Sequence, residues 1–129
     1  MKIVSWNVNS RSKGETLRDQ CAFLSSLACD VICLQEITLK SQVFFKEFFK
    51  DRHIISSFDL SKDLDLLTRK RKYGEIIVSN YPFRPLDPYR IKIPFPERVL
   101  SVKFLHSYKD LEIYTTHVPP GSSNGVIKV

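Results

Sequence analysis

The sequence has no apolar run long enough to cross a bilayer, because a membrane helix needs about 20 consecutive apolar residues. It also lacks a secretory signal peptide. The apolar stretch over residues 3–8 is interrupted by Ser5 and Asn7, and positive charge returns at Arg11 and Lys13. These absences argue against a membrane-spanning or secreted protein. We therefore expect a cytoplasmic, intracellular location and no membrane partner.

Cysteines are few, and their pattern is not that of a disulfide framework or a zinc finger. The chain has three of them, Cys21, Cys29 and Cys33, all within predicted regular structure. We expect buried free thiols, which behave as small apolar side chains. A redox or metal role is the alternative.

The composition is that of an ordinary globular chain with a basic surface. Its 129 residues are typical of one domain with a hydrophobic core, and 43% of them are hydrophobic and 26% charged. The formal net charge of +6 favours polyanions, because neutralising phosphates releases counterions. Nucleic acid or another phosphorylated ligand is therefore the favoured partner. A basic surface that binds neither is the alternative.

The apolar pattern predicts alternating strands and helices. Strands are expected at residues 2–8, 31–35, 53–58, 74–79, 98–105 and 111–116, and helices at residues 15–28 and 41–50. The opening strand–helix–strand order predicts a parallel crossover, and the apolar first strand is typical of a strand inside a sheet. The last two strands are expected to form a hairpin. Four phenylalanines in the second helix are expected in the core, with an exposed interface as the alternative.

Polar residues stand at the carboxyl ends of three predicted strands. Asn7 and Asn9 follow the first strand, Glu36 follows the second and His117 follows the last. Binding sites of α/β sheets form at this edge. A carboxylate there needs a balancing charge, which Mg²⁺ or a neighbouring Lys or Arg could supply. His117 is either a proton donor near neutral pH or a structural histidine.

Four strings in the chain match known sequence patterns. They read Lys-Ile-Val-Ser-Trp-Asn-Val-Asn at residues 2–9, Asp-Val-Ile-Cys-Leu-Gln-Glu at 30–36, Tyr-Gly-Glu-Ile-Ile-Val-Ser at 73–79 and Thr-Thr-His-Val-Pro at 115–119. In this order they resemble the endonuclease/exonuclease/phosphatase superfamily, which includes exonuclease III, abasic-site endonucleases and deoxyribonuclease I. The resemblance implies a deoxyribonuclease I-like α/β fold, the first half of a four-layer sandwich with a mixed sheet flanked by helices.

The resemblance also implies a chemistry, the metal-assisted hydrolysis of a phosphodiester. Glu36 would ligate Mg²⁺ or Mn²⁺, and Asn7 would orient the phosphate or the base that activates water. Asn9 would support the metal-binding residues or contact phosphate. His117 matches the general-acid His of the deoxyribonuclease I and sphingomyelinase branches, where the exonuclease III branch carries Tyr.

The resemblance leaves three functions open. A DNA-repair nuclease comes first. A phosphatase or lipid phosphodiesterase on the same scaffold comes second, and a non-catalytic binding or assembly module comes third. The basic run at residues 69–72 is interpreted as a solvated face, with phosphate contact as the alternative.

The later motifs of the family are absent from the sequence. Neither Gly-Asp-x-Asn nor Ser-Asp-His, which complete the family's site, occurs in the 129 residues. The family's domain runs to about 250 residues, a size typical of a single α/β domain. Residues 1–129 are therefore expected to be the N-terminal part of one domain whose C-terminal half is absent, through truncation or because a partner chain supplies it. We expect them to be inactive alone.

Overall fold

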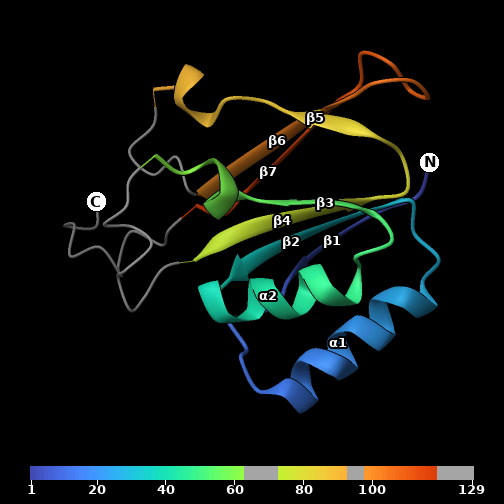
Figure 1. Ribbon diagram of the computed structural model, residues 1–129, viewed down its shortest axis with the longest axis vertical. Helices are drawn as coiled ribbons and strands as arrows, with labels where there is room; N and C mark the ends of the chain where they lie inside the picture. The colour runs from blue at the N-terminus through green and yellow to red at the C-terminus, as the bar shows by residue number, and fades with distance from the viewer. Residues whose placement is uncertain (63–72, 93–97, 119–129) are drawn as a thin grey trace, which may run out of the picture.

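The computed structural model describes residues 1–62, 73–92 and 98–118 (Figure 1). Its strands are β1 (Ile3–Asn7), β2 (Val31–Ile37), β3 (His53–Ser56), β4 (Gly74–Ser79), β5 (Phe83–Pro85), β6 (Val99–Phe104) and β7 (Glu112–Thr116). Its α-helices are α1 (Gly14–Ser26) and α2 (Leu39–Phe48), and two 3-10 turns are η1 (Ser57–Leu60) and η2 (Pro88–Arg90). The strands form two sheets, which we name sheet A, with the order β1-β2-β4-β3, and sheet B, with the order β5-β6-β7.

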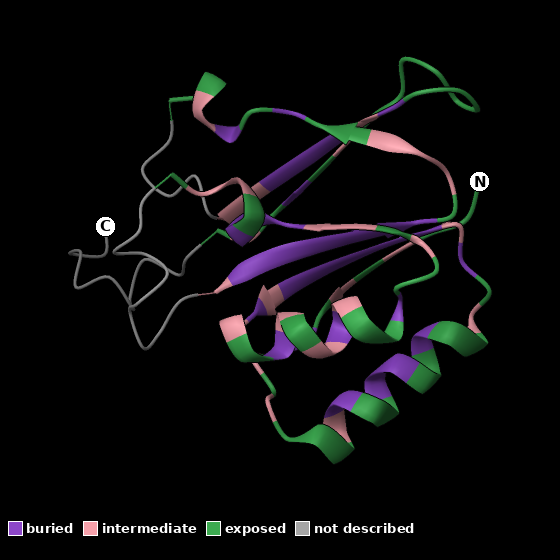
Figure 2. Cartoon of the chain, in the orientation of Figure 1, coloured by how far each residue is buried: buried purple, intermediate pink, exposed green. Residues whose placement is uncertain are grey.

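The elements stack in layers. The α-helices α1 and α2 lie on one face of sheet A, and sheet B lies on the other (Figure 1). Alternate residues of a strand point to opposite faces, so the central strands of sheet A contribute to two cores. Ile32 packs with Leu24 and Phe45 under the helices, whereas Ile77 packs with Val102 between the sheets. Figure 2 shows the buried residues on both sheets and on the side of α1 that faces sheet A.

The predicted fold class is confirmed. Strands β1 and β2 are parallel, whereas β2 and β4 are antiparallel, so sheet A is a mixed sheet. Strands β6 and β7 form the expected antiparallel hairpin. In the part of the chain that is described, the α-helices all cover sheet A, and the layers are therefore one of helices and two of strands. No described helix is long and apolar enough to pass through a membrane.

The prediction that the first strand lies inside a sheet is wrong for the described residues. Within them β1 pairs only with β2 and forms an edge of sheet A. Its exposure alternates along the strand, and Ile3 is 48% exposed. The apolar sequence of β1 reflects a face that packs on α1, where Trp6 meets Phe23 edge to face at 5.6 Å between ring centroids.

The phenylalanines of α2 divide between core and solvent. Phe45 and Phe49 are buried, whereas Phe44 is half-buried and Phe48 is 44% exposed. Phe48 is the last residue of α2, and its ring packs edge to face against that of Phe49, with centroids 4.9 Å apart, while much of it stays in solvent. The core prediction is therefore correct for only part of the set. The helix also begins earlier than predicted, because Thr38 caps it by accepting from the backbone N–H of Ser41.

Two predicted features lie outside the described residues. They are the basic run at residues 69–72 and Pro119, the last residue of the fourth motif.

The three cysteines are free and buried, as expected. Burial raises the pKa of the Cys21 thiol to about 12 and that of Cys33 to about 11. The thiolate is the reactive form, so Cys21 and Cys33 of the folded protein at pH 8 are expected to react with iodoacetamide far more slowly than in the urea-unfolded chain. Mass spectrometry of timed samples measures this difference. Rapid labelling of Cys21 or Cys33 in the folded protein would instead support the redox alternative.

The same pKa values predict a loss of stability in alkali. Unfolded thiols ionise near pH 8.5, whereas Cys21 and Cys33 keep their protons in the folded protein until about pH 11 to 12. Above pH 9 the unfolded state therefore binds fewer protons than the folded state, and the free energy of unfolding falls as the pH rises. Urea titrations at pH 8 and pH 10 measure this change.

Candidate functional site

A β-bulge in β2 places Glu36. Leu34 pairs with Ile76 and Ile37 pairs with Gly74, so β2 has one residue more than β4 between these pairs. Glu36 takes up the difference with a left-handed backbone, at φ 56°. Bulges of this kind redirect a side chain and recur beside active sites. Glu36 was expected just after the strand, but it lies within β2, on a backbone conformation that is costly for a residue with a Cβ.

The side chains of Glu36 and His117 come together at one edge of the two sheets. His117 Nε2 lies 3.9 Å from Glu36 Oε2, and the two side chains are 18% and 19% exposed. This distance exceeds a hydrogen bond, and the contact becomes an ion pair only when the imidazole is protonated. The backbone N–H of His117 donates to Arg98 O at 3.1 Å, which extends the β6–β7 ladder by one bond beyond the last strand residue.

The other imidazole nitrogen is also informative. His117 Nδ1 is buried and has no hydrogen-bond partner among the described residues. A buried polar atom without a partner costs free energy and is uncommon in folded proteins. The environment of His117 is therefore energetically less favourable than that of a structural histidine whose two ring nitrogens are both hydrogen-bonded.

The loop after β1 is tied to both Asn7 and Glu36. Asn7 Oδ1 accepts from the backbone N–H of Asn9 at 2.9 Å, which leaves the Asn7 amide NH₂ as its donor group. The backbone N–H of Ser10 donates to Glu36 O at 3.0 Å. Asn9 and Ser10 both have left-handed backbones, with φ of 58° and 51°. The loop thus turns sharply over the end of β2.

The structure therefore gathers most of the predicted site at one edge. Asn7 pairs with Gln35 in the β1–β2 ladder, one residue before Glu36, and Glu36 meets His117 from sheet B. Strands β1, β2 and β7 all run toward the left of the view in Figure 1 and bring their carboxyl ends to this edge. Asn9 is exposed, and its established contact is the backbone bond that shapes the turn.

Two further polar residues of this edge were not predicted from the sequence. Glu75 is 1% exposed and lies opposite the bulge, where its backbone N–H donates to Ser57 Oγ at 3.0 Å. Gln35 is 9% exposed and bonds to both sheets through its amide. The only signal for either residue was a polar side chain beside a run of buried apolar positions, which is also the pattern of an ordinary strand end.

The donor groups fit a divalent cation that keeps most of its water. Glu36 offers one partly exposed carboxylate, and Mg²⁺ in proteins is commonly held by one or two carboxylates together with water and phosphate oxygens. Within residues 1–62, 73–92 and 98–118 no group of three or more His, Cys, Asp or Glu residues could enclose an ion. A metal at Glu36 would therefore also need other ligands, such as water and phosphate oxygens.

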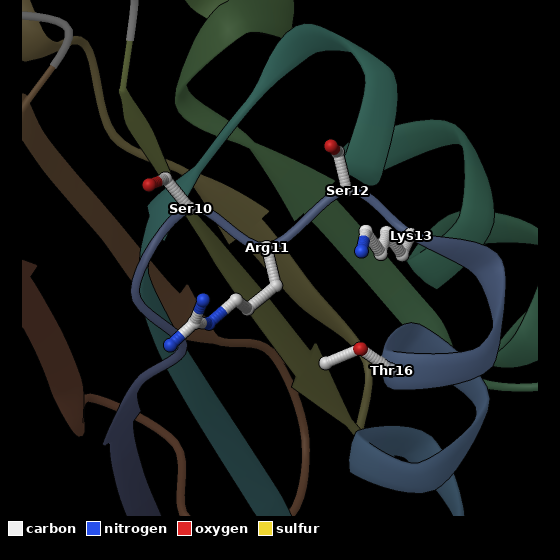
Figure 3. A pocket seen from close by; sticks show the side chains of 5 residues that line it. All are labelled: Ser10, Arg11, Ser12, Lys13 and Thr16. Atoms are coloured by element: carbon white, nitrogen blue, oxygen red, sulfur yellow. The ribbon is translucent and has the colours of Figure 1, made fainter.

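A basic cavity opens beside the loop that follows β1. It has a volume of about 450 Å³ and is lined by Ser10, Arg11, Ser12, Lys13 and Thr16 (Figure 3). Lys13 occupies the N-cap position of α1, and its side chain caps no backbone N–H group there. The first N–H groups of a helix attract anions when they are not capped. Two cations, three hydroxyl groups and a helix N-terminus thus adjoin the edge that carries Asn7 and Glu36.

Comparison with known proteins agrees with the motifs. A model of the Endonuclease/Exonuclease/phosphatase family matches residues 4–125. The crystal structure of D. rerio TDP2 humanized by 14 mutations is similar in fold, with a TM-score of 0.51 and 17% sequence identity. The similarity covers 88% of this chain and 44% of that one, so the chain spans less than half of that structure's length. No curated protein matches the sequence.

Proposed function

Because this chain belongs to the Endonuclease/Exonuclease/phosphatase family, we propose that it carries half of the site of a metal-dependent phosphodiesterase of the nuclease type. The observation that supports this most directly is the contact between Glu36 and His117. The two side chains come from different sheets and their polar atoms lie 3.9 Å apart, and Glu36 is itself the left-handed residue of the bulge. An acidic ligand next to a proton donor suits phosphodiester cleavage.

Enzymes of the family generally use divalent metals, and Glu36 is the residue proposed to hold one here, with Mg²⁺ or Mn²⁺ as the ion. When bound, such an ion polarises a phosphoryl oxygen and offsets the charge that develops on the phosphate. The bulge turns the Glu36 carboxylate out of the ladder, while the bond from Ser10 N–H holds its backbone. The residue is thus held rigidly while its carboxylate keeps access to solvent.

The remaining roles follow from the donor groups. The His117 imidazole, when protonated, can donate from Nε2 to the leaving oxygen. The Asn7 NH₂ group can donate to a phosphate oxygen or orient the base that activates water, since its Oδ1 already accepts from Asn9. Asn9 has a supporting role, because its left-handed backbone sets the turn that fixes Asn7.

These groups form only the half of the site that binds and polarises the phosphate. The Gly-Asp-x-Asn and Ser-Asp-His motifs that complete it in the family do not occur in the 129 residues. We propose that residues 1–129 are the N-terminal part of such a domain and that the completing residues come from further sequence or from a partner chain.

DNA is the favoured substrate, as in a nuclease of the repair type. The net charge of +6 and the cavity beside Arg11 and Lys13 support a polyanion that lies across the edge of the sheets. A phosphatase or lipid phosphodiesterase is the second candidate, because the His117 position is shared by the branch that includes sphingomyelinases. A metal-independent binding or assembly module is the third.

Metal binding tests the proposed site. The Glu36→Gln variant removes one negative charge and keeps the shape of the side chain, so Mn²⁺ affinity is expected to fall at least about 10-fold. Electron paramagnetic resonance of free Mn²⁺ measures this affinity. Glu47→Gln is the matched control, because Glu47 is an exposed residue of α2 whose salt bridge is with Lys50. Equal Mn²⁺ affinity in all three proteins would refute the proposed site.

Salt dependence separates DNA from the other candidates. Binding to a fluorescent duplex is expected to weaken steeply between 50 and 200 mM salt, as it does for proteins that neutralise several phosphates. The double variant Arg11→Gln/Lys13→Gln should lower the slope of log affinity against log salt by about 2, because each phosphate contact contributes about 1. Lys50→Gln/Lys109→Gln has the same charge and should keep the slope. Equal slopes in the two double variants would remove the loop from the proposed DNA surface.

A further inference from the structure

The side chain of Gln35 connects the two sheets beside the candidate site. Its Nε2 donates to Ser5 Oγ in β1 at 3.0 Å and to Thr115 Oγ1 in β7 at 2.9 Å, with a longer contact to Cys33 O at 3.4 Å. Gln35 is 9% exposed and Thr115 is 5% exposed. Buried hydrogen bonds of this kind fix side chains firmly, because a partner lost inside the protein is not replaced by water.

Each of the three residues joined by these hydrogen bonds lies one or two positions before a proposed site residue on the same strand. Gln35 directly precedes Glu36. Ser5 stands two positions before Asn7, and Thr115 stands two positions before His117, so both members of each of these two pairs lie on the same face of their strand.

The hydrogen bonds of Gln35 contribute less to the position of β1 than to the position of β7. Strand β1 is already held to β2 by a parallel ladder that runs from Ile3 to Asn7, so the bond to Ser5 adds to an existing connection. Strand β7 belongs to sheet B and shares no ladder with β2. Its distance from Glu36 depends on side chains packed between the sheets, and the bond from Gln35 to Thr115 is a directional contact among them.

We propose that Gln35 is a positioning residue whose bond to Thr115 holds β7 where His117 can reach Glu36. It touches no substrate in this role. Its purpose rests on the proposed function, since the spacing of His117 and Glu36 matters only if they act together. The spacing itself can be measured without metal or substrate.

Three variants separate this link from the general stability of the fold. Gln35→Met keeps the length of the side chain and removes both donated bonds. Thr115→Val keeps the shape of its side chain and removes only the bond to β7. Ser5→Ala removes only the bond to β1 and is the matched control, because the β1–β2 ladder remains.

Nuclear Overhauser effects report the spacing directly. In the unmodified protein a cross-peak is expected between the His117 ring and the Glu36 side chain, whose polar atoms lie 3.9 Å apart. This cross-peak should disappear in Gln35→Met and Thr115→Val and persist in Ser5→Ala. The cross-peak between Trp6 and Phe23, on the other face of sheet A, should persist in every variant and shows that each is folded.

Three results would overturn the proposal. They are a His117–Glu36 cross-peak that survives in Thr115→Val, one that is lost equally in Ser5→Ala, and one that is absent from the unmodified protein. The double variant Gln35→Met/Thr115→Val should behave like either single variant, because both remove the same bond. Failure of Mn²⁺ binding with these cross-peaks as expected would refute the metal site and leave the positioning role intact. If Mn²⁺ binds as expected but the cross-peaks do not change as expected, only the positioning role of Gln35 is refuted.

Discussion

The 129-residue chain is expected to hydrolyse no phosphodiester bond above the rate in buffer, even with saturating Mg²⁺ or Mn²⁺. Its proposed groups, Glu36, Asn7 and His117, can bind and polarise a phosphate and donate a proton. Hydrolysis also requires activation of the attacking water, and groups that act as a unit lose nearly all of their effect when one is missing. The motifs that supply this function in the family are not in the sequence.

Three substrates make this test informative, namely supercoiled plasmid, a duplex with an abasic site and a small chromogenic phosphodiester. The unmodified chain and Glu36→Ala should give the same background with each. Robust turnover that vanishes in Glu36→Ala would contradict the expected inactivity and would show that the described half-site is sufficient. Turnover that persists in Glu36→Ala would instead indicate a contaminating nuclease.

Much of the arrangement of the candidate residues could be predicted from the sequence. Parallel strands bring their carboxyl ends to one edge, so polar residues after the predicted strands were expected to meet there. Asn7 and Glu36 follow this rule because β1 and β2 pair in parallel register. His117 follows it because the β6–β7 hairpin carries the carboxyl end of β7 to the same edge, where it meets Glu36.

The bulge at Glu36 and the hydrogen bond between the two sheets could not be predicted from the sequence pattern. A left-handed residue within a strand is usually signalled by glycine, and the bulge of β2 instead uses Glu36, which gives no such signal. The bond from Gln35 to Thr115 joins residues 80 positions apart in two different sheets. Strand periodicity shows which face a residue occupies, but it does not show which residues of a second sheet will lie opposite.

The pattern of exposure was also only partly predictable. The apolar content of β1 predicts an interior strand, although in the described residues β1 is an edge whose Ile3 is half exposed. Composition reports how apolar a strand is, whereas its place in a sheet depends on which partners pair with it.

Gly74→Ala is expected to destabilise the protein by about 3 kcal/mol, a large part of the total stability of a small domain. A Cβ at this position would lie 2.5 Å from Ser57 Oγ and 2.9 Å from two ring atoms of Phe58. Neither neighbour can move easily, because Ser57 Oγ accepts the backbone N–H of Glu75 and Phe58 is 5% exposed. The added methyl group must therefore displace packed structure at the start of β4, opposite the bulge.

Gly14, the other glycine of the described residues, provides a matched control. A Cβ at Gly14 would meet no atom within 4 Å, and the residue opens α1. Gly14→Ala should therefore be neutral or stabilise the protein by up to about 1 kcal/mol, because alanine loses less conformational freedom on folding. Thermal unfolding should place Gly74→Ala on the order of 10 °C below the unmodified protein and Gly14→Ala at or above it. Equal midpoints for the two variants would mean that η1 does not pack against Gly74 as described, and the support for the bulge at Glu36 would then have to come from elsewhere.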